Sequence, residues 1–318
     1  MNGPKFASWE STLRCDLKCI HCGLCAGPEC TNLRGPELST EEAKGMFDQL
    51  VSLGVSNLVI SGGEFTTRGD CKELLALALE RFVMVRQISN GLYGKYFFKR
   101  FEPMDNLNRY ILSLSLDGLE RTHDAIRKMS GSFWRVIEIL NADSPIQRTV
   151  ITTVMRENFQ ELEDVFQLLM KLSVPVWAIQ LGLPEGRMSS ASFIGEEKIR
   201  RLADTILDWQ MRAEDVMEVI PDDCFGYRHL MRFKNHWKGC QAGKNLITIL
   251  SNGDVTGCPT TFHSICGNIR ENTLEEIWNG DKMNNFRSEL PRCSSCDNKI
   301  CQGGCRAVNH VFGKQFCF

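Results

Sequence analysis

The sequence is poor in features that would direct the chain to a membrane or to nucleic acid. Its 318 residues contain no uninterrupted apolar run long enough to cross a bilayer, and the first ten, MNGPKFASWE, include no apolar signal stretch. The net charge is only −2, which gives no electrostatic reason to expect nucleic-acid binding. We also find no internal repeat and no low-complexity segment. These absences predict a globular cytoplasmic protein whose partners include neither a membrane nor nucleic acid.

Cysteine, in contrast, is abundant. The 15 cysteines fall into two groups, at positions 15–30 and 224–317, and Cys71 alone lies between them. In a reducing compartment, clustered cysteines indicate metal or redox chemistry rather than structural disulfides. We therefore expect an ordinary fold in the middle of the chain and metal chemistry towards both ends.

The first group contains a triplet, Cys15, Cys19 and Cys22, with the spacing C-x3-C-x2-C. Three thiolates at this spacing can hold three irons of a 4Fe–4S cube and leave the fourth iron open to a substrate or cofactor. A zinc site or a set of buried cysteines is the alternative, and the triplet alone does not decide between them. The candidates for a fourth zinc ligand are Cys25, Cys30 and His21.

Short β-branched runs alternate with helical patterns over the first two thirds of the chain. The expected strands are residues 6–12, 58–61, 82–89, 110–116, 148–155 and 176–181. The expected helices are residues 72–80, 96–101, 133–140, 159–172 and 196–212, preceded by one that Ser39 and Glu42 open with a capping box. This alternation predicts an α/β fold with a parallel sheet wound into a full or partial barrel, and the cysteine triplet lies in the first loop of its active-site edge.

The expected domain boundary follows the helix at residues 196–212. Beyond about residue 219, glycine and cysteine become more frequent and the expected strands are short. Residues 246–255 predict a hairpin with a turn at Asn252 and Gly253. We therefore assign residues 1–215 to the barrel and residues 216–318 to a small cysteine-rich α+β domain.

Small motifs follow several of the expected strands. Gly62 and Gly63, followed by Glu64, allow the backbone to approach a ligand, and oxygens there can accept hydrogen bonds from an ammonium group. Ser89-Asn90-Gly91 and Ser115-Leu116-Asp117-Gly118 end the next two strands. Arg127 can form a bidentate pair with a carboxylate, through two parallel hydrogen bonds. Taken singly, each motif is equally consistent with an ordinary turn or a solvated helix.

Together, the triplet and these loops resemble the radical SAM superfamily over roughly residues 6 to 215. The resemblance implies a partial, TIM-like (β/α)6 barrel that binds S-adenosylmethionine, with Cys15, Cys19 and Cys22 as cluster ligands. It implies that Gly62, Gly63 and Glu64 contact the methionine ammonium group, that Ser115 and Arg127 bind its carboxylate and ribose region, and that His21 packs near the adenine. The other cofactor-binding candidates are Ser89, Asn90, Asp117 and Gln180.

The C-terminal cysteines resemble the SPASM domain, an extension that binds two auxiliary 4Fe–4S clusters. Gly267-Asn268-Ile269-Arg270 and the run from Leu274 to Trp278 support this resemblance. It implies that the first auxiliary cluster is held by Cys240, Cys258 and Cys305. It implies that the second is held by Cys293, Cys296, Cys301 and Cys317. A zinc ribbon built from Cys293, Cys296, Cys301 and Cys305 is the alternative.

The first auxiliary cluster then lacks a fourth protein ligand in the usual position. It is either open or closed by Cys224 or Cys266, the nearest remaining cysteines. Cys224 has two further interpretations: a catalytic thiol that returns a hydrogen atom to a substrate radical, or a small buried core residue. The last expected strand contains Trp177 and Gln180 and is followed by residues 184–188. These residues either face the substrate or form a core strand that ends in a turn.

The resemblance implies an enzyme that cleaves S-adenosylmethionine to a 5′-deoxyadenosyl radical, using three 4Fe–4S clusters in all. A ribosomally made peptide is the first substrate hypothesis, with crosslinking, epimerisation or oxidation as the reaction. A sugar-like molecule such as an aminoglycoside is the alternative, and a non-catalytic zinc or iron–sulfur scaffold is the third. The expected partners are an electron donor such as flavodoxin or ferredoxin and a separate leader-peptide-binding protein.

Overall fold

The computed structural model describes residues 3–28, 34–101, 104–225, 239–288 and 304–313. One ten-stranded sheet runs through them in the order β10-β9-β8-β1-β2-β3-β4-β5-β6-β7. All neighbours from β8 to β7 are parallel, and β9 and β10 add an antiparallel end. The strands are β1 (Phe6–Glu10), β2 (Asn57–Ser61), β3 (Met84–Ser89), β4 (Tyr110–Ser115), β5 (Gln147–Val154), β6 (Val176–Leu181), β7 (Glu218–Pro221), β8 (Leu246–Ile249), β9 (Asp254–Thr256) and β10 (Gly267–Asn268).

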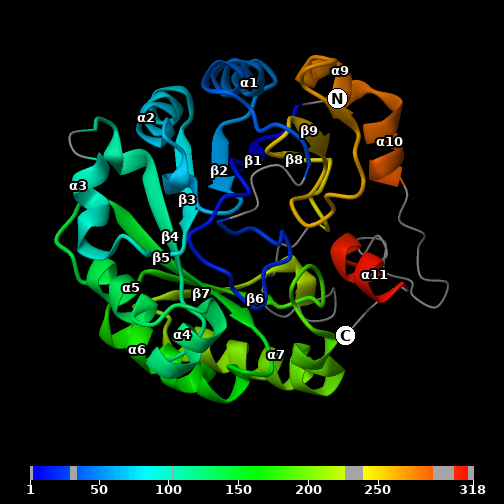
Figure 1. Cartoon of the computed structure of the whole chain (residues 1–318). Helices are drawn as coiled ribbons and strands as arrows, with labels where there is room; N and C mark the ends of the chain where they lie inside the picture. Colours follow the sequence, from blue (N-terminus) through cyan, green and yellow to red (C-terminus); the bar gives the residue numbers. More distant parts are fainter. Residues whose placement is uncertain (1–2, 29–33, 102–103, 226–238, 289–303, 314–318) are drawn as a thin grey trace.

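Helices cover the outside of this curved sheet (Figure 1). Ser39 and Glu42 form the expected capping box at the start of the first helix. The helices are α1 (Thr40–Ser52), α2 (Cys71–Arg81), α3 (Phe97–Phe101), α4 (Glu120–Arg127), α5 (Ser132–Leu140), α6 (Leu162–Lys171), α7 (Gly195–Arg212), α9 (Leu274–Asn279), α10 (Asp281–Ser288) and α11 (Arg306–Phe312).

The α/β fold and its partial barrel confirm the prediction from the sequence. All six expected strands are present within about two residues of their expected bounds, and β8 and β9 form the expected hairpin. In the described part of the chain, β7 and β10 are the two ends of the sheet, so the barrel stays open. The domain boundary at residue 215 stays a prediction. The sheet itself is continuous across it, because β7 pairs with β6 and β8 pairs with β1.

Aromatic side chains fill the layer between the sheet and its helices. The Trp9 ring of β1 lies 5.5 Å from the Phe47 ring of α1. The Trp177 ring of β6 lies 5.0 Å from the Trp209 ring of α7. Trp177 is fully buried and its indole N–H donates to Thr152 Oγ1 at 2.8 Å, so it belongs to the core and does not face a substrate. This packing fixes the strands whose carboxyl ends carry the cysteine triplet and the loops around it.

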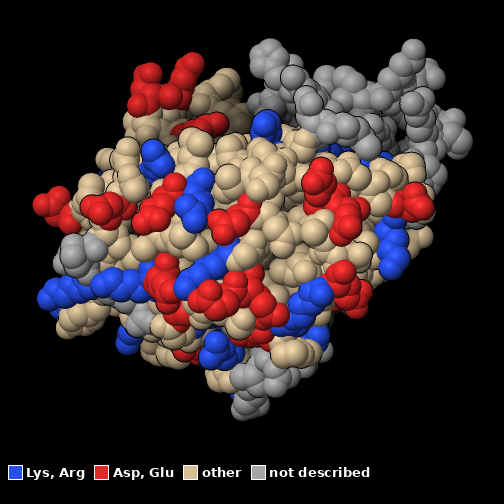
Figure 2. Space-filling view, turned by 90° about the horizontal axis from the view of Figure 1, so that it is seen from above, with Lys and Arg blue, Asp and Glu red and all other residues tan. Residues whose placement is uncertain are grey.

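The surface shows no dominant charge on the face that Figure 2 presents, where acidic and basic side chains are interspersed. Among the described helices, none combines the length and the apolar character that a bilayer crossing requires.

Candidate active site

The loop after β2 and the cysteine loop after β1 are joined directly through their backbones. The Gly63 N–H donates to the Thr12 carbonyl at 2.6 Å, and the Glu64 N–H donates to the Arg14 carbonyl at 2.8 Å. A Cβ atom at Gly62 would lie 2.5 Å from the Thr12 oxygen, and one at Gly63 would lie 2.1 Å from the Arg14 oxygen. The two glycines are therefore needed for the approach of one loop to the other, a reason that the sequence did not show.

The Glu64 side chain joins the β2 loop to the β3 loop. It is completely buried, and its carboxylate accepts hydrogen bonds from Ser89 Oγ at 3.0 Å and from the Asn90 N–H at 2.8 Å. It also accepts one from Thr66 Oγ1 at 2.8 Å. Burial raises the pKa of Glu64, and these donors counteract that effect. Protein donors thus occupy this carboxylate, and its expected contact with a ligand ammonium group stays a prediction.

The cysteine triplet lines a cavity of about 130 Å³ together with Gly62, Gly63, Ser89, Asn90, Ser115 and Arg127. Hydrogen-bond donors point at two of its sulfur atoms. Asn90 Nδ2 lies 3.8 Å from Cys15 Sγ, and Arg127 Nη1 lies 3.8 Å from Cys19 Sγ. Burial raises the pKa of Cys15 to about 12, so the thiol gives up a proton only when it binds a metal. Donors of this kind stabilise thiolates that carry a cluster.

The spacing of the sulfur atoms bears on the choice between zinc and iron–sulfur. A zinc ion with bonds of about 2.3 Å holds its sulfur ligands about 3.8 Å apart. Among the residues that the structure describes, Cys15, Cys19 and Cys22 do not form a group with all ligand atoms within 4.8 Å of one another. Cys240, Cys258 and Cys305 do not form one either. Neither trio therefore has the close spacing of a zinc site, and its assignment to a cluster stays a prediction.

A buried ion pair between Arg127 and Asp117 lies next to the cysteine triplet. Arg127 Nη2 lies 2.6 Å from Asp117 Oδ2, with both side chains almost completely buried. Burial by itself would raise the pKa of Asp117, but Arg127 and the Thr153 N–H, which donates to Asp117 Oδ1 at 2.9 Å, hold it below its usual range. Burial lowers the pKa of His21 to about 4, so this ring is neutral at pH 7. Asp117 thus fixes the arginine that faces Cys19 and itself lies beneath the cavity.

Arg187 holds the cysteine loop in place through two hydrogen bonds to its backbone. Its Nε donates to the Cys19 carbonyl at 2.9 Å, and its Nη2 donates to the Ala26 carbonyl at 2.8 Å. The neighbouring Gly186 has a φ of +60°, and a Cβ there would lie 2.5 Å from the Cys22 carbonyl oxygen. Residues 184–188 are therefore the segment that packs on the cysteine loop. The sequence singled out this segment but did not indicate the role of Arg187.

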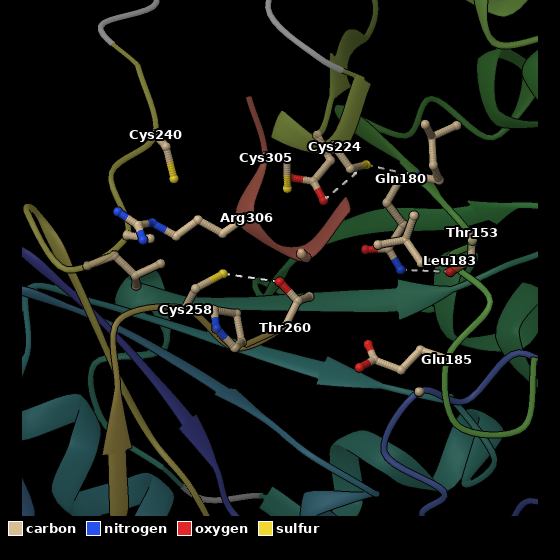
Figure 3. Close-up of a pocket in the computed structure, with 18 of the residues that line it drawn as sticks. Thr153, Gln180, Leu183, Glu185, Cys224, Cys240, Cys258, Thr260, Cys305 and Arg306 are labelled. Atoms are coloured by element: carbon tan, nitrogen blue, oxygen red, sulfur yellow. Dashed lines mark hydrogen bonds between the residues drawn. The ribbon is translucent and has the colours of Figure 1, made fainter. Parts of the chain in front are cut away.

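A second cavity, of about 290 Å³, lies between β6, the residues after β7 and the C-terminal hairpin (Figure 3). Cys240, Cys258 and Cys305 line it, as the first auxiliary set, and Cys224 lies on the same wall. Burial raises the pKa values of Cys258, to about 11, and of Cys305. The structure thus brings the first auxiliary set together. The second set, Cys293, Cys296, Cys301 and Cys317, lies outside the described residues, as does Cys30.

Gln180 and Cys224 belong to this larger cavity. Gln180 Nε2 donates to Thr153 Oγ1 at 2.7 Å, so the amide lies away from the smaller cavity with which the sequence grouped it. Cys224 Sγ accepts the Leu181 N–H at 3.3 Å and lies 3.7 Å from Asp222 Oδ2. Cys266, by contrast, packs in the hydrophobic core and is not part of either cavity lining.

The two cavities share one wall residue. His21, two residues after Cys19 in the cysteine loop, lines both of them. A molecule in the larger cavity and a ligand in the smaller one would therefore meet at this ring. This arrangement places the two cysteine trios in neighbouring cavities that His21 separates.

Known proteins share both the sequence pattern and the fold. Residues 9–169 match the family model of the Radical SAM superfamily, and residues 240–298 match that of SPASM, an iron–sulfur cluster-binding domain. An AdoMet-dependent heme synthase of Methanosarcina barkeri (strain Fusaro) is 31% identical, over 96% of this chain and 92% of that protein. The mycofactocin maturase MftC of Mycolicibacterium smegmatis is 28% identical, over 98% of this chain and 81% of its own. The crystal structure of Streptococcus suis SuiB bound to S-adenosylmethionine, 18% identical, superposes with a TM-score of 0.77 over 100% of this chain and 76% of its own.

Proposed function

Since this chain belongs to the radical SAM superfamily, we propose that it is an enzyme that abstracts a hydrogen atom from a ribosomally made peptide. The two matched domains imply S-adenosylmethionine and 4Fe–4S clusters as cofactors. When bound, they supply a 5′-deoxyadenosyl radical. Cys15, Cys19 and Cys22 would hold the radical-generating cluster, and an electron donor such as flavodoxin or ferredoxin would reduce it.

The shared wall of the two cavities is the observation that supports this proposal most strongly. A substrate in the larger cavity would lie next to the cysteine trio there, with only the His21 ring between it and the smaller cavity. The ion pair of Asp117 and Arg127 orients the arginine towards Cys19. Arg187 holds the backbone of the cysteine loop in place. These residues would thereby hold the cysteine loop in the position from which its thiolates bind a cluster.

A peptide substrate is supported by the names of two relatives. The PqqA peptide cyclase of Rhizobium meliloti is named for a peptide, and AlbA of Bacillus subtilis is named for the biosynthesis of the bacteriocin subtilosin. In the larger cavity, the Gln180 amide and the Thr153 hydroxyl offer hydrogen bonds of the kind that a peptide backbone accepts and donates.

A tetrapyrrole is a second candidate substrate. The relatives named AdoMet-dependent heme synthase and Fe-coproporphyrin III synthase support it, at 31% and 28% identity. Arg306, on the wall of the larger cavity, would pair with a carboxylate of such a molecule. A peptide carboxylate would use the same arginine, so the cavity by itself does not separate the two candidates.

The proposal predicts turnover of a peptide under anaerobic conditions. We expect the reconstituted enzyme, given S-adenosylmethionine, a reductant and a library of short peptides in deuterated water, to form 5′-deoxyadenosine together with a modified peptide. Mass spectrometry distinguishes the reactions: a loss of two hydrogens indicates crosslinking or oxidation, and a gain of one deuterium indicates epimerisation. Parallel incubations contain Fe-coproporphyrin III or an aminoglycoside. Turnover of one of these compounds, with every peptide unchanged, would replace the peptide hypothesis.

We further propose that the Cys224 thiol returns a hydrogen atom to the substrate radical. Its sulfur lies on the wall of the larger cavity and not in the smaller one. Cys224→Ala should then still form 5′-deoxyadenosine and remove a substrate hydrogen, but should yield a desaturated or unrepaired product in place of an epimer. Cys71→Ala is the matched control, because Cys71 is equally buried and lines neither cavity. Loss of iron from Cys224→Ala would assign Cys224 as a cluster ligand, and a normal product with full iron content would exclude both roles.

A further inference from the structure

Three potential metal ligands meet at the edge of the larger cavity, outside both cysteine trios. Glu185 follows β6 in the barrel, His263 follows β9, and His310 belongs to α11. Their ligand atoms all lie within 4.8 Å of one another, and this is the one such group among the described residues. We refer to these three residues as the Glu–His–His cluster.

The contacts within the cluster are close. His263 Nε2 lies 2.7 Å from Glu185 Oε1. The His310 ring stacks on the His263 ring with centroids 4.2 Å apart and planes inclined by 24°. An ion pair between Glu185 and His263 would account for the first contact, but it gives no reason for a second imidazole at the same place. Two imidazoles and one carboxylate are a common ligand set for Zn²⁺ and Fe²⁺.

An aromatic ring borders the cluster. The Phe262 ring lies 4.0 Å from the His263 ring. Arg34, whose guanidinium lies 4.7 Å from the centre of the Phe262 ring, pairs with Glu10 at 2.6 Å. This arginine is therefore engaged by a carboxylate outside the cluster.

We propose that Glu185, His263 and His310 bind a divalent transition-metal ion. Three protein ligands leave at least one coordination position open, as in catalytic zinc sites. Glu185 also lines the larger cavity, and Figure 3 shows its carboxylate pointing towards the interior of the cavity. The open position thus lies next to the substrate space, where a metal would bind a substrate carboxylate or carbonyl oxygen. The ion would also connect the barrel to α11, whose N-cap residue is Cys305.

Zinc itself is the probe for this site, and the test uses the enzyme with its iron–sulfur clusters in place. After removal of loosely bound metal, we expect isothermal titration calorimetry to show one zinc ion per chain. The zinc K-edge X-ray absorption spectrum should show nitrogen and oxygen neighbours at about 2.0–2.1 Å. Sulfur neighbours at about 2.3 Å, or the absence of binding at micromolar zinc, would overturn the proposal. Either result concerns the metal alone and is independent of the substrate proposed above.

Variants of the cluster residues distinguish a metal site from a simple ion pair between Glu185 and His263. His263→Asn, His310→Asn and Glu185→Gln should each weaken zinc binding by roughly tenfold or more, because each removes a ligand. Glu271→Gln is the matched control, an exposed carboxylate outside the cluster whose loss should leave zinc binding unchanged. Iron content is measured on every variant to confirm that the clusters are retained. Wild-type zinc affinity in all three cluster variants would leave only the ion pair, and would refute the site.

Discussion

Replacing Cys15, Cys19 and Cys22 together with alanine should abolish the formation of 5′-deoxyadenosine from S-adenosylmethionine. The three residues line the smaller cavity and are its only cysteines among the described residues, so their loss removes the assigned ligands of the cluster that supplies the electron. Ten assigned cysteines in three clusters correspond to about twelve irons per chain, at about four per cube, and the triple variant should retain about eight. Liquid chromatography of the nucleoside and a colorimetric iron assay measure the two effects.

Two controls accompany this experiment. Cys71→Ala should keep full cleavage and full iron, since the side chain of Cys71, the first residue of α2, is buried in the core and lines neither cavity. Undiminished cleavage by the triple variant would contradict the assignment of the radical cluster. Stoichiometric zinc together with a single cluster would instead support a zinc ribbon in the C-terminal region.

Arg127→Leu should lower the free energy of unfolding by about 3–5 kcal/mol, because it leaves the Asp117 carboxylate buried without its ionic partner. Chemical denaturation of the protein, followed by circular dichroism, measures this loss. The double variant Arg127→Leu/Asp117→Asn should recover much of it, since no buried charge then remains. Arg81→Leu, which removes an ion pair between exposed side chains, should have little effect. A loss in the double variant as large as in the single one would contradict this account.

The same ion pair predicts a dependence of stability on pH. Arg127 holds the pKa of Asp117 below its unfolded value of about 3.9, so the folded state binds this proton less readily than the unfolded state. The stabilisation is therefore complete above about pH 5 and is lost as the pH falls through the folded pKa. In Asp117→Asn, the part of the stability loss at low pH that comes from protonation of Asp117 should be absent.

The early strands could be predicted from the sequence because they are short, mostly apolar runs that end at turn motifs and alternate with helical patterns. Among the strands and α-helices that precede β8, two lie outside those predictions for physical reasons. β7 spans only Glu218–Pro221, which is too short to show a clear alternation of apolar and polar residues. α4 buries His123 and Arg127 beside a single aliphatic residue, Ile126, so its inner face carries no apolar periodicity. The partners of these polar side chains, above all Asp117, are known only from the folded structure.

The candidate site was predictable where its chemistry depends on residue type and spacing. The cysteine triplet is of this kind, and the structure gathers its thiols around one cavity with the loops that the sequence indicated. Arg187 could not be predicted, because its partners are backbone carbonyls 168 and 161 residues away, which leave no trace in residue identity. For Gly62 and Gly63 the sequence indicated a close approach, but not that the approaching partner is the cysteine loop itself.

The position of β1 in the middle of the sheet has a consequence for how the protein is made. β1 pairs on one side with β2 and on the other with β8, and hydrogen bonds join Lys5 to Asn245 across a separation of 240 residues. During synthesis, the strand that leads into the cysteine triplet emerges early and keeps one edge unpaired until most of the chain has been translated. Contacts over so long a separation form slowly, and an unpaired strand edge can pair with another chain in the meantime. The outer edge of β1 is thus the place where a nascent chain is most exposed to misassembly.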